Sequence, residues 1–461
     1  MNKNFPLKIG LEIHGYINTK EKLFCSCETD FLKKTPNIFI CPICTGQPGS
    51  KPMLPNEEAI KKMIQISLIL NCRINHEGEM RWQRKHYDWP DLPKGYQDTI
   101  SGAHSTPCAE NGIFEGIRIK ECHLEEDPAQ WNPETGEINY NRSGIPLIEI
   151  VTEPDFKNVE QVVVWLSNLI NTLSYIKAIR KNAGIKVDVN VSTYGERVEI
   201  KNINSLDKIK KALEYEIVRQ LEEHSKGNDI KRETLAYDES KGKTIKMREK
   251  EGQADYRFIP DPDLPSLKIT KEEIDEIKKN LPELPSEKLK KLIEKHSLKK
   301  EDAEIIIKNL ALVEFAEELS KKVDLKKYIS WVTIELLRVL NYNKKTLDDE
   351  DIEILPEHLA ELLELVDKGE ITILKAKLIM NDFVPKSFSV KEKMKEQIGK
   401  LSEEETRKLV EKAISENKKA YEEFKQGKKE SLNFLIGEVM KLSNRKADFK
   451  KVKELIEKTN S

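Results

Sequence analysis

The chain has 461 residues, of which 38% are hydrophobic and 34% charged, and its formal net charge is −2. This length allows two to four domains, and the composition is typical of a core-forming protein with a heavily charged surface. The near-zero net charge argues against a uniformly basic nucleic-acid coat but is compatible with local basic patches. No apolar run approaches the roughly 20 residues that a membrane helix needs, and the first residues lack the apolar core of a signal peptide. We therefore expect a cytoplasmic protein without a membrane partner.

The first predicted element is a β-strand over residues 7–17. Its apolar side chains alternate with a second face that carries Lys8, Gly10, Glu12, His14 and Tyr16. Glu12 and His14 are two residues apart, so a carboxylate and an imidazole project side by side. A solvated strand face is the plainer interpretation of this pair taken alone.

A cluster of cysteines follows this strand. The spacing is C-x-C and then C-x-x-C, formed by Cys25, Cys27, Cys41 and Cys44. Four closely spaced thiols in a cytosolic chain predict a structural zinc site that pins the loop after the first strand. The alternative is a set of buried thiols without a metal.

The next elements are a helix and a long loop. Residues 52–75 predict a helix capped by Asn56. Residues 84–102 are rich in aromatic, Pro, Lys and Gly residues, which predicts an ordered loop rather than a helix or strand. Tyr87, Trp89 and Tyr96 in one loop favour a functional role, and a solvated connector is the alternative.

Residues 113–126 predict a strand that ends in His123-Leu124-Glu125-Glu126-Asp127. Adjacent carboxylates repel one another unless they are solvated, cap a helix or are neutralised by a cation, and an exposed acidic turn is the usual case. An apolar strand is expected within residues 140–155, and a helix with one broad apolar stripe over residues 158–183.

Two further strands repeat the pattern of the first. Residues 185–191 place Asp188 on a polar face, and residues 197–203 do the same for Glu199. If the three polar faces converge, the acids form a cluster with His14 that suits a hard divalent cation. A helix capped by Ser205 follows.

The composition changes near residue 281, because strand signals end there and short amphipathic helices follow. A second joint is expected at Pro385, and residues 391–461 contain 19 Lys and Arg against 14 Asp and Glu. We therefore expect an α+β fold in three domains. A mixed α/β domain with an antiparallel sheet spans residues 1–280, an all-α linker spans 281–390, and a small, locally basic all-α tail spans 391–461.

Several motifs of the chain occur together in the order found in one family. They are LEIH, CPICTGQPG, PDLPKGYQ, HLEED, YNRSGIPLIEIVTEPD, VEIKNINS and DYRFIPDPDLP, followed by helical motifs that extend to FLIGEVMKLSNRKAD. In this order they resemble the B subunit of aspartyl/glutamyl-tRNA amidotransferases, and the resemblance covers the whole chain. Each motif alone is weakly diagnostic, whereas their common order is highly specific.

This resemblance implies a reaction and its cofactors. The family uses ATP with Mg²⁺ to phosphorylate the side-chain carboxylate of Glu-tRNA(Gln) or Asp-tRNA(Asn), and ammonia then displaces the phosphate. The ammonia comes from a separate amidase (A) subunit, and a small C subunit completes the complex. The resemblance also implies a cradle fold with a helical tail that reaches the tRNA. The chain has no P-loop motif, so its ATP site is of another kind.

The site residues follow from the matching motifs and the polar strand faces. The expected catalytic residues are Glu12, His14, Glu125, Glu126, Asp188 and Glu199. All of these except Glu126 are also expected to hold magnesium. The expected substrate-binding residues are Lys94, Tyr96, Arg142, Lys201 and Asn202.

Two alternatives remain open at this point. One is the E-type paralogue of the same superfamily, which often has proline where Pro128 follows HLEED, while B subunits commonly continue Ala-Gly-Lys. That type carries a large inserted domain, and no such insert fits between Leu264 and Leu281. The other is a non-catalytic, zinc-containing tRNA-binding module, which would not need Glu12, Glu125 and Asp188.

Overall fold

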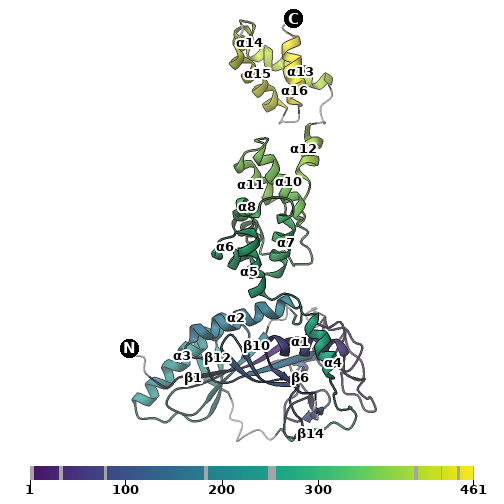
Figure 1. The fold of residues 1–461 in the computed structure, drawn as a ribbon, viewed down its shortest axis with the longest axis vertical. Helices are drawn as coiled ribbons and strands as arrows, with labels where there is room; N and C mark the ends of the chain where they lie inside the picture. The colour runs from purple at the N-terminus through teal and green to yellow at the C-terminus, as the bar shows by residue number, and fades with distance from the viewer. Residues whose placement is uncertain are drawn as a thin grey trace. The chain divides into compact units, whose positions relative to one another are not determined.

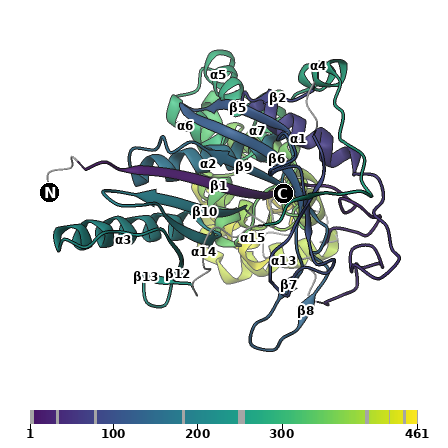
Figure 2. The same ribbon diagram turned by 90° about the horizontal axis from the view of Figure 1, so that it is seen from below.

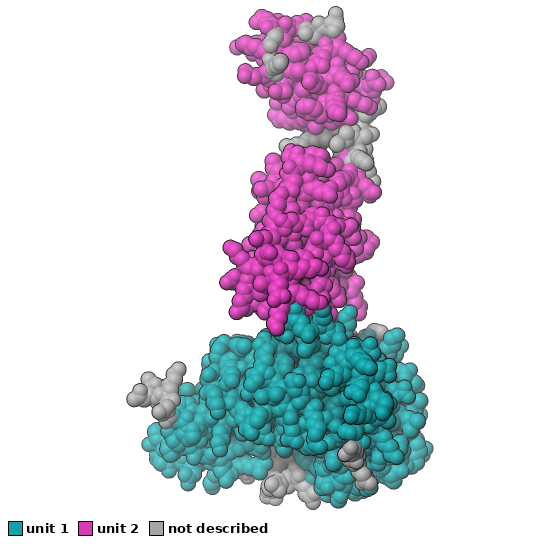
Figure 3. Space-filling model, viewed as in Figure 1, with its two compact units in different colours: residues 1–287 teal, residues 288–461 magenta. Residues whose placement is uncertain are grey.

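The computed structural model describes residues 5–30, 35–76, 80–180, 185–247, 256–398, 403–426, 428–443 and 447–459. The chain divides into two compact units, residues 1–287 and residues 288–461, which are coloured separately in Figure 3. No helix among the described residues is both long and apolar enough to cross a membrane.

The first unit is built on one large, mixed sheet (Figures 1 and 2). Its strands run in the order β13-β12-β11-β10-β1-β9-β6-β4-β3-β14, and β5 pairs with both β6 and β2. The bounds are β1 Lys8–Tyr16, β2 Arg73–Ile74, β3 Gln83–Lys85, β4 Gln97–Thr99, β5 Ala109–Phe114, β6 Ile117–Glu126, β9 Pro146–Thr152, β10 Ile185–Ser192, β11 Val198–Ile203, β12 Glu233–Asp238, β13 Lys243–Lys246 and β14 Ile259–Pro260. Its pairs are antiparallel except β11 with β12, which are parallel. A separate hairpin joins β7 (Gln130–Trp131) to β8 (Ile138–Asn139).

The two faces of the sheet differ because alternate residues of each strand project to opposite sides. The apolar face contributes Leu11 and Ile13 of β1, Ile150 of β9 and Val189 of β10 to one hydrophobic core. Helices α1 (Glu57–Ile69), α2 (Val159–Tyr175) and α3 (Leu206–Ser225) contribute buried side chains to the same core. In Figure 2 the strands pass in front of α2, so the viewer looks onto the other, polar face. That face is where the candidate site lies.

Three helix starts expected from the sequence are confirmed by their caps. The side chains of Asn56, Asn158 and Ser205 accept hydrogen bonds from the first free backbone N–H groups of α1, α2 and α3. Helix α2 ends at Tyr175, earlier than the expected residue 183. The expected loop over residues 84–102 is also shorter, because β3 and β4 pair within it.

The second unit is helical, as the sequence predicts, and its helices are short. They are α5 Pro285–His296, α6 Lys300–Ile306, α7 Leu310–Ser320, α8 Leu325–Ser330, the π-helix η2 Trp331–Leu336, α9 Leu337–Tyr342, α10 Pro356–Asp367, α11 Ile373–Asn381, α12 Val390–Ile398, α13 Glu403–Glu416, α14 Lys418–Lys425, α15 Lys429–Leu442 and α16 Phe449–Lys458. Helix α4 (Lys271–Lys279) still belongs to the first unit.

The α+β fold class is confirmed, since a mixed sheet with helices is followed by a helical region. Residues 410–456 form a hydrophobic cluster of their own within the second unit. The division into domains 1–280, 281–390 and 391–461 stays a prediction. The contacts within the chain define two compact units, with one boundary after residue 287.

Candidate active site on the polar face of the sheet

The strand register brings the expected acids together on the polar face. Glu12 of β1 lies opposite Asp188 of β10, and His14 lies opposite Glu149 of β9. Glu149 in turn lies opposite His123 of β6. Paired residues of neighbouring antiparallel strands share a face and bring their side chains close. Four adjacent strands therefore supply one continuous polar surface.

The first acidic group consists of His14, Glu125 and Glu149, whose possible ligand atoms all lie within 4.8 Å of one another. His14 Nδ1 is 3.3 Å from Glu125 Oε1 and 4.0 Å from Glu149 Oε2. On its other side, Glu149 Oε2 is 3.2 Å from Nε2 of the buried His123. Imidazoles and carboxylates thus alternate along this face, in the order His123, Glu149, His14 and Glu125.

These charges shift one another's protonation. Burial lowers the pKa of His14, but the hydrogen bond to Glu125 and the charge of Glu149 outweigh it and raise the pKa to about 9. Burial likewise opposes ionisation of Glu149, yet the neighbouring His123 holds the pKa of that carboxyl well below its usual range. Both carboxylates of the group are therefore ionised at neutral pH.

The second acidic group consists of Glu12, Asp188 and Glu199, again with ligand atoms within 4.8 Å. Lys201 Nζ pairs with Asp188 Oδ2 at 2.6 Å and with Glu199 Oε1 at 2.5 Å. Burial, and then the charge of Glu149, raise the pKa of Glu12. The expected cluster of five is thus brought together as two neighbouring groups joined by β1, and Lys201 already pairs with two acids of the second group.

The first group fits a hard divalent cation better than the second. Glu125 is 2% exposed, and its Oε2 has no hydrogen-bond partner among the described residues. A buried carboxylate oxygen without a hydrogen bond can accept a cation as a ligand, and the nearest positive charge, Lys85 Nζ, is 4.0 Å away. The carboxylate oxygens of Glu125 and Glu149 suit Mg²⁺ or Mn²⁺. In the second group, the ammonium of Lys201 already occupies the position that a cation would take.

Two lysines line the same face near these acids. Lys85 Nζ of β3 is 4.0 Å from Glu125 Oε2. Lys186 of β10 lies over the Tyr16 ring at 5.4 Å and pairs with no carboxylate of the described residues. Burial lowers the pKa of Lys186, while nearby Asp127 opposes the shift. A lysine that lacks its own counter-ion can bind an anionic ligand.

Glu126 does not join the catalytic acids expected beside it. As the next residue of β6, it projects to the opposite side from Glu125. Its Oε1 lies 2.5 Å from Lys94 Nζ and accepts a hydrogen bond from the N–H of Asp98 at 3.0 Å. Lys94 also pairs with Asp98 Oδ2 at 2.6 Å. Lys94, expected to bind substrate, is therefore the half-buried counter-ion of two acids on the side away from His14.

The other expected substrate-binding residues lie in different surroundings. The Tyr96 ring lies 5.0 Å from Lys94 Nζ and 4.4 Å from the guanidinium of Arg84. Arg142 pairs with Asp127 Oδ2 at 2.8 Å and donates to the carbonyls of Pro128 and Ala129. Asp127 also accepts from the Tyr16 hydroxyl of the polar face. The side chain of Asn202 lies outside the described residues.

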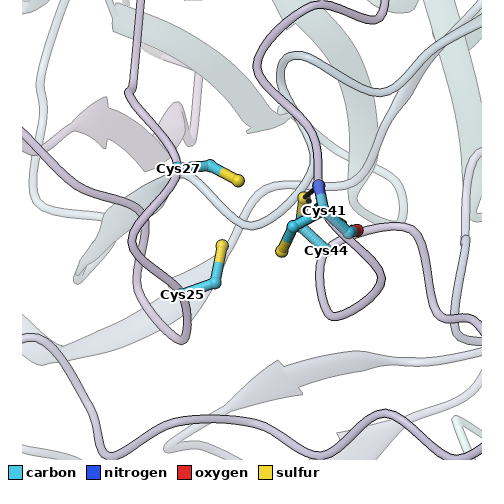
Figure 4. A group of neighbouring side chains, drawn as sticks. All are labelled: Cys25, Cys27, Cys41 and Cys44. Carbon is cyan, nitrogen blue, oxygen red and sulfur yellow. Dashed lines mark hydrogen bonds between the residues drawn. The ribbon is translucent and has the colours of Figure 1, made fainter.

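The four cysteines predicted to bind zinc converge (Figure 4). Their sulfur atoms lie within 4.8 Å of one another, and two loop segments supply them. The hydrogen bond from Cys25, and then the Lys22 ammonium, lower the pKa of Cys44 to about 5 despite burial. Four thiols at this spacing, with one already prone to ionise, fit a tetrahedral metal such as zinc.

Sequence reasoning missed Glu149, His123, Lys85 and Lys186. Glu149 is the one acid in the otherwise apolar strand β9, and such an interruption is a usable signal. His123 precedes Glu125 by two residues, so strand periodicity places both on one face. Lys85 gave no signal, because its three-residue strand lay inside a predicted loop.

Comparisons with known proteins identify the family of the chain. A family described as the GatB/GatE catalytic domain matches residues 7–275, and a family described as the GatB domain matches residues 314–459.

A relative from Methanocaldococcus jannaschii is 41% identical over 98% of each chain. A relative from Methanothermobacter thermautotrophicus is 43% identical over 98% of this chain and 99% of its own. A third, from Methanobrevibacter smithii, is 44% identical over 95% and 96%. All three are named as the B subunit of aspartyl/glutamyl-tRNA(Asn/Gln) amidotransferase, which favours the B type over the E type. The chain belongs to the GatB/GatE family, as a relative of these B subunits.

Proposed function

We propose that this chain is the activating subunit of a tRNA-dependent amidotransferase. It phosphorylates the side-chain carboxylate of Glu-tRNA(Gln) or Asp-tRNA(Asn) with ATP and completes amide formation with ammonia from a partner amidase. A free carboxylate is a poor acyl donor because oxide is a poor leaving group, and phosphorylation supplies a better one. The near full-length similarity to proteins of that name supports this assignment.

The observation that carries the proposal is the convergence of His14, Glu125 and Glu149 on one sheet face. These three side chains would hold a divalent cation, which would neutralise charge that develops during phosphoryl transfer. His14 would coordinate as the neutral imidazole, so ion binding would displace its proton. The second group lies next to this cation site and would position the bound substrates. It consists of Glu12, Asp188 and Glu199, with Lys201 paired to the last two.

Two lysines on the polar face would bind anionic groups of the substrates. Lys85, beside Glu125, and Lys186, without a carboxylate partner among the described residues, are placed to bind phosphate oxygens or the amino acid's carboxylate. Arg142 holds Asp127 and two backbone carbonyls, which makes it a positioning residue for the end of β6. On the side of β6 away from His14, ion pairs stabilise the fold of the first unit. They join Lys94 to Glu126 and Asp98.

The remaining parts have structural and binding roles in this proposal. Zinc bound by Cys25, Cys27, Cys41 and Cys44 pins the loops after β1, because a closed four-thiolate site leaves no position for chemistry. The A and C subunits are the protein partners, and the chain works in the cytoplasm. The tail, residues 391–461, holds the outer body of the tRNA.

The test is transamidation after co-expression with an amidase partner, using both Glu-tRNA(Gln) and Asp-tRNA(Asn). We expect ATP- and Mg²⁺-dependent amide formation on at least one of them. ATP hydrolysis should depend on the charged tRNA. Binding of tRNA without ATP hydrolysis or amide formation would instead favour the non-catalytic module.

A further inference from the structure

Lys22 is a buried lysine that the proposed reaction does not use. Lys22 is 1% exposed. In the chain it lies between β1 and the first pair of cysteines. Its ammonium donates to the carbonyl of Phe39 at 2.9 Å, to the carbonyl of Tyr140 at 3.2 Å and to Cys44 Sγ at 3.4 Å. Three acceptors satisfy the three N–H bonds of an ammonium.

The charge of this ammonium requires a partner. Moving an uncompensated ion out of water costs several kcal/mol, and carbonyl dipoles supply hydrogen bonds but no net charge. Of the three acceptors, Cys44 alone can ionise. A metal-bound cysteine is a thiolate, so a loaded site supplies the negative charge that buried Lys22 lacks.

The metal site gains from the same pairing. Four thiolates around Zn²⁺ carry a net charge of about −2, by the usual ionisation of zinc-bound cysteines. A buried cation beside one of the sulfurs halves that charge. A charge-assisted hydrogen bond also withdraws electron density from the sulfur.

We propose that Lys22 is the outer-sphere cation of the four-cysteine site: it compensates the charge of the metal–thiolate cluster and shields the Cys44 thiolate. This inference rests on the proposed zinc site and not on the amidotransferase reaction. Lys22 acts through Cys44 and is therefore a positioning residue.

The same ammonium links the metal site to the loop that leads to β9. Besides the bond to the Tyr140 carbonyl, the Ser143 hydroxyl donates to the Cys44 carbonyl at 2.7 Å. Leu23 N–H donates to the Gly144 carbonyl at 2.8 Å. Arg142, which holds Asp127, lies within this loop. Loss of the metal would leave Lys22 without its charge partner and loosen the contacts of this loop.

The experiment uses the full chain co-expressed with its amidase partner, with Co²⁺ substituted for zinc as a spectroscopic probe. Lys22→Met removes charge and hydrogen bond, and Lys22→Gln keeps a donor without charge. Lys20→Met is the matched control, because Lys20 is exposed nearby. We expect the sulfur-to-cobalt charge-transfer band to move to lower energy in Lys22→Met and by less in Lys22→Gln. Zinc transfer to a chromogenic chelator should be roughly tenfold faster in Lys22→Met, and Lys20→Met should match the parent protein in both.

A second measurement needs no variant. Cys25 and Cys44 are equally buried, at 6% and 5% exposed, but only Cys44 accepts from Lys22. In the zinc-loaded parent protein, maleimide should therefore modify Cys25 before Cys44.

Each outcome decides a separate point. A parent protein that binds neither zinc nor cobalt overturns the zinc site and this inference with it, while leaving the amidotransferase proposal to its own assay. If both Lys22 variants bind metal and their sulfur-to-cobalt band is unshifted, the proposed role of Lys22 is overturned, while the zinc site itself stands. If neither variant folds, equal labelling of Cys25 and Cys44 overturns it, and slower labelling of Cys44 supports it.

Discussion

His14 and Glu125 meet across an intervening strand. His14 is on β1 and Glu125 on β6, with β9 between them in the sheet, and His14 Nδ1 lies 3.3 Å from Glu125 Oε1. Glu149 projects from that middle strand and is opposite both His14 and His123. Three strands thus set the geometry of the proposed cation site, and a rigid sheet holds such ligands more firmly than a loop would.

Glu125→Gln keeps the shape of the side chain but removes its charge. We expect amide formation to fall by roughly 10²-fold or more, by analogy with the loss of one electrostatic stabiliser of a transition state. Glutaminase activity of the complex should persist, because in the proposed assembly the amidase partner carries it. The assay is transamidation at saturating Mg²⁺, where unchanged amide formation would refute the role of Glu125.

Glu149→Gln tests a residue that sequence reasoning missed, and Glu126→Gln is its counterpart on the other side of the sheet. The Glu149 variant should need more Mg²⁺ for half-maximal activity. The Glu126 variant should leave that Mg²⁺ requirement in place and lower the free energy of unfolding by roughly 1–3 kcal/mol, because Lys94 loses a charged partner. Mg²⁺ titrations and urea unfolding separate the two effects, and a shifted Mg²⁺ requirement in the Glu126 variant would contradict the face assignment.

In the absence of Mg²⁺, the protein should lose stability at alkaline pH through His14. The pKa of His14 is raised to about 9 in the folded protein, above its ordinary value, by Glu125 and Glu149. The interactions that hold the proton on His14 add to the free energy of unfolding. Their contribution is complete below about pH 6.5 and is lost as the pH rises through about 9. Urea unfolding without added Mg²⁺ and without a chelator, so that zinc stays bound, should show a larger loss between about pH 6 and about pH 9.5 for the parent protein than for His14→Asn. An equal loss would show that the Glu125 and Glu149 charges do not hold this proton.

Cys41→Ala removes one proposed zinc ligand. Because metal binding and folding are coupled, we expect less soluble protein, a lower Tm and loss of bound zinc. Elemental analysis of the purified parent protein should find about one zinc per chain. Cys108→Ala is the control, since Cys108 is buried away from the cluster. A fully active parent protein without zinc would contradict the proposal.

Deletion of residues 391–461 tests the proposed tRNA contact. The tail has its own hydrophobic cluster, so its removal spares the sheet that carries the acids. Helix α16 exposes Lys450, Lys451, Lys453 and the ring of Phe449. We expect a higher KM for aminoacyl-tRNA and a weaker dependence of binding on salt, because fewer phosphates are contacted. Equal affinity with the same salt slope would show that the tail is not a tRNA contact.

The sequence alone determined much of the local structure, because alternation and capping are local properties. It identified β1, β10 and β11 with their polar faces, the caps at Asn56 and Ser205, the start of α2 at residue 158, and the change to helices near residue 281. The cysteine spacing and the order of the motifs were likewise readable without coordinates, and the comparisons confirm the family.

Tertiary structure decided which residues meet. Strand order places β9 between β1 and β6 and so brings Glu149 between His14 and His123, which no local pattern encodes. Alternation along β6 then separates Glu125 from Glu126, although the two are adjacent in the chain. Pairing with Glu126, which is distant in the chain, also made Lys94 a counter-ion, and the fold placed Lys22 against Cys44. Partners of this kind depend on the register and packing of distant segments, and only the folded chain fixes these.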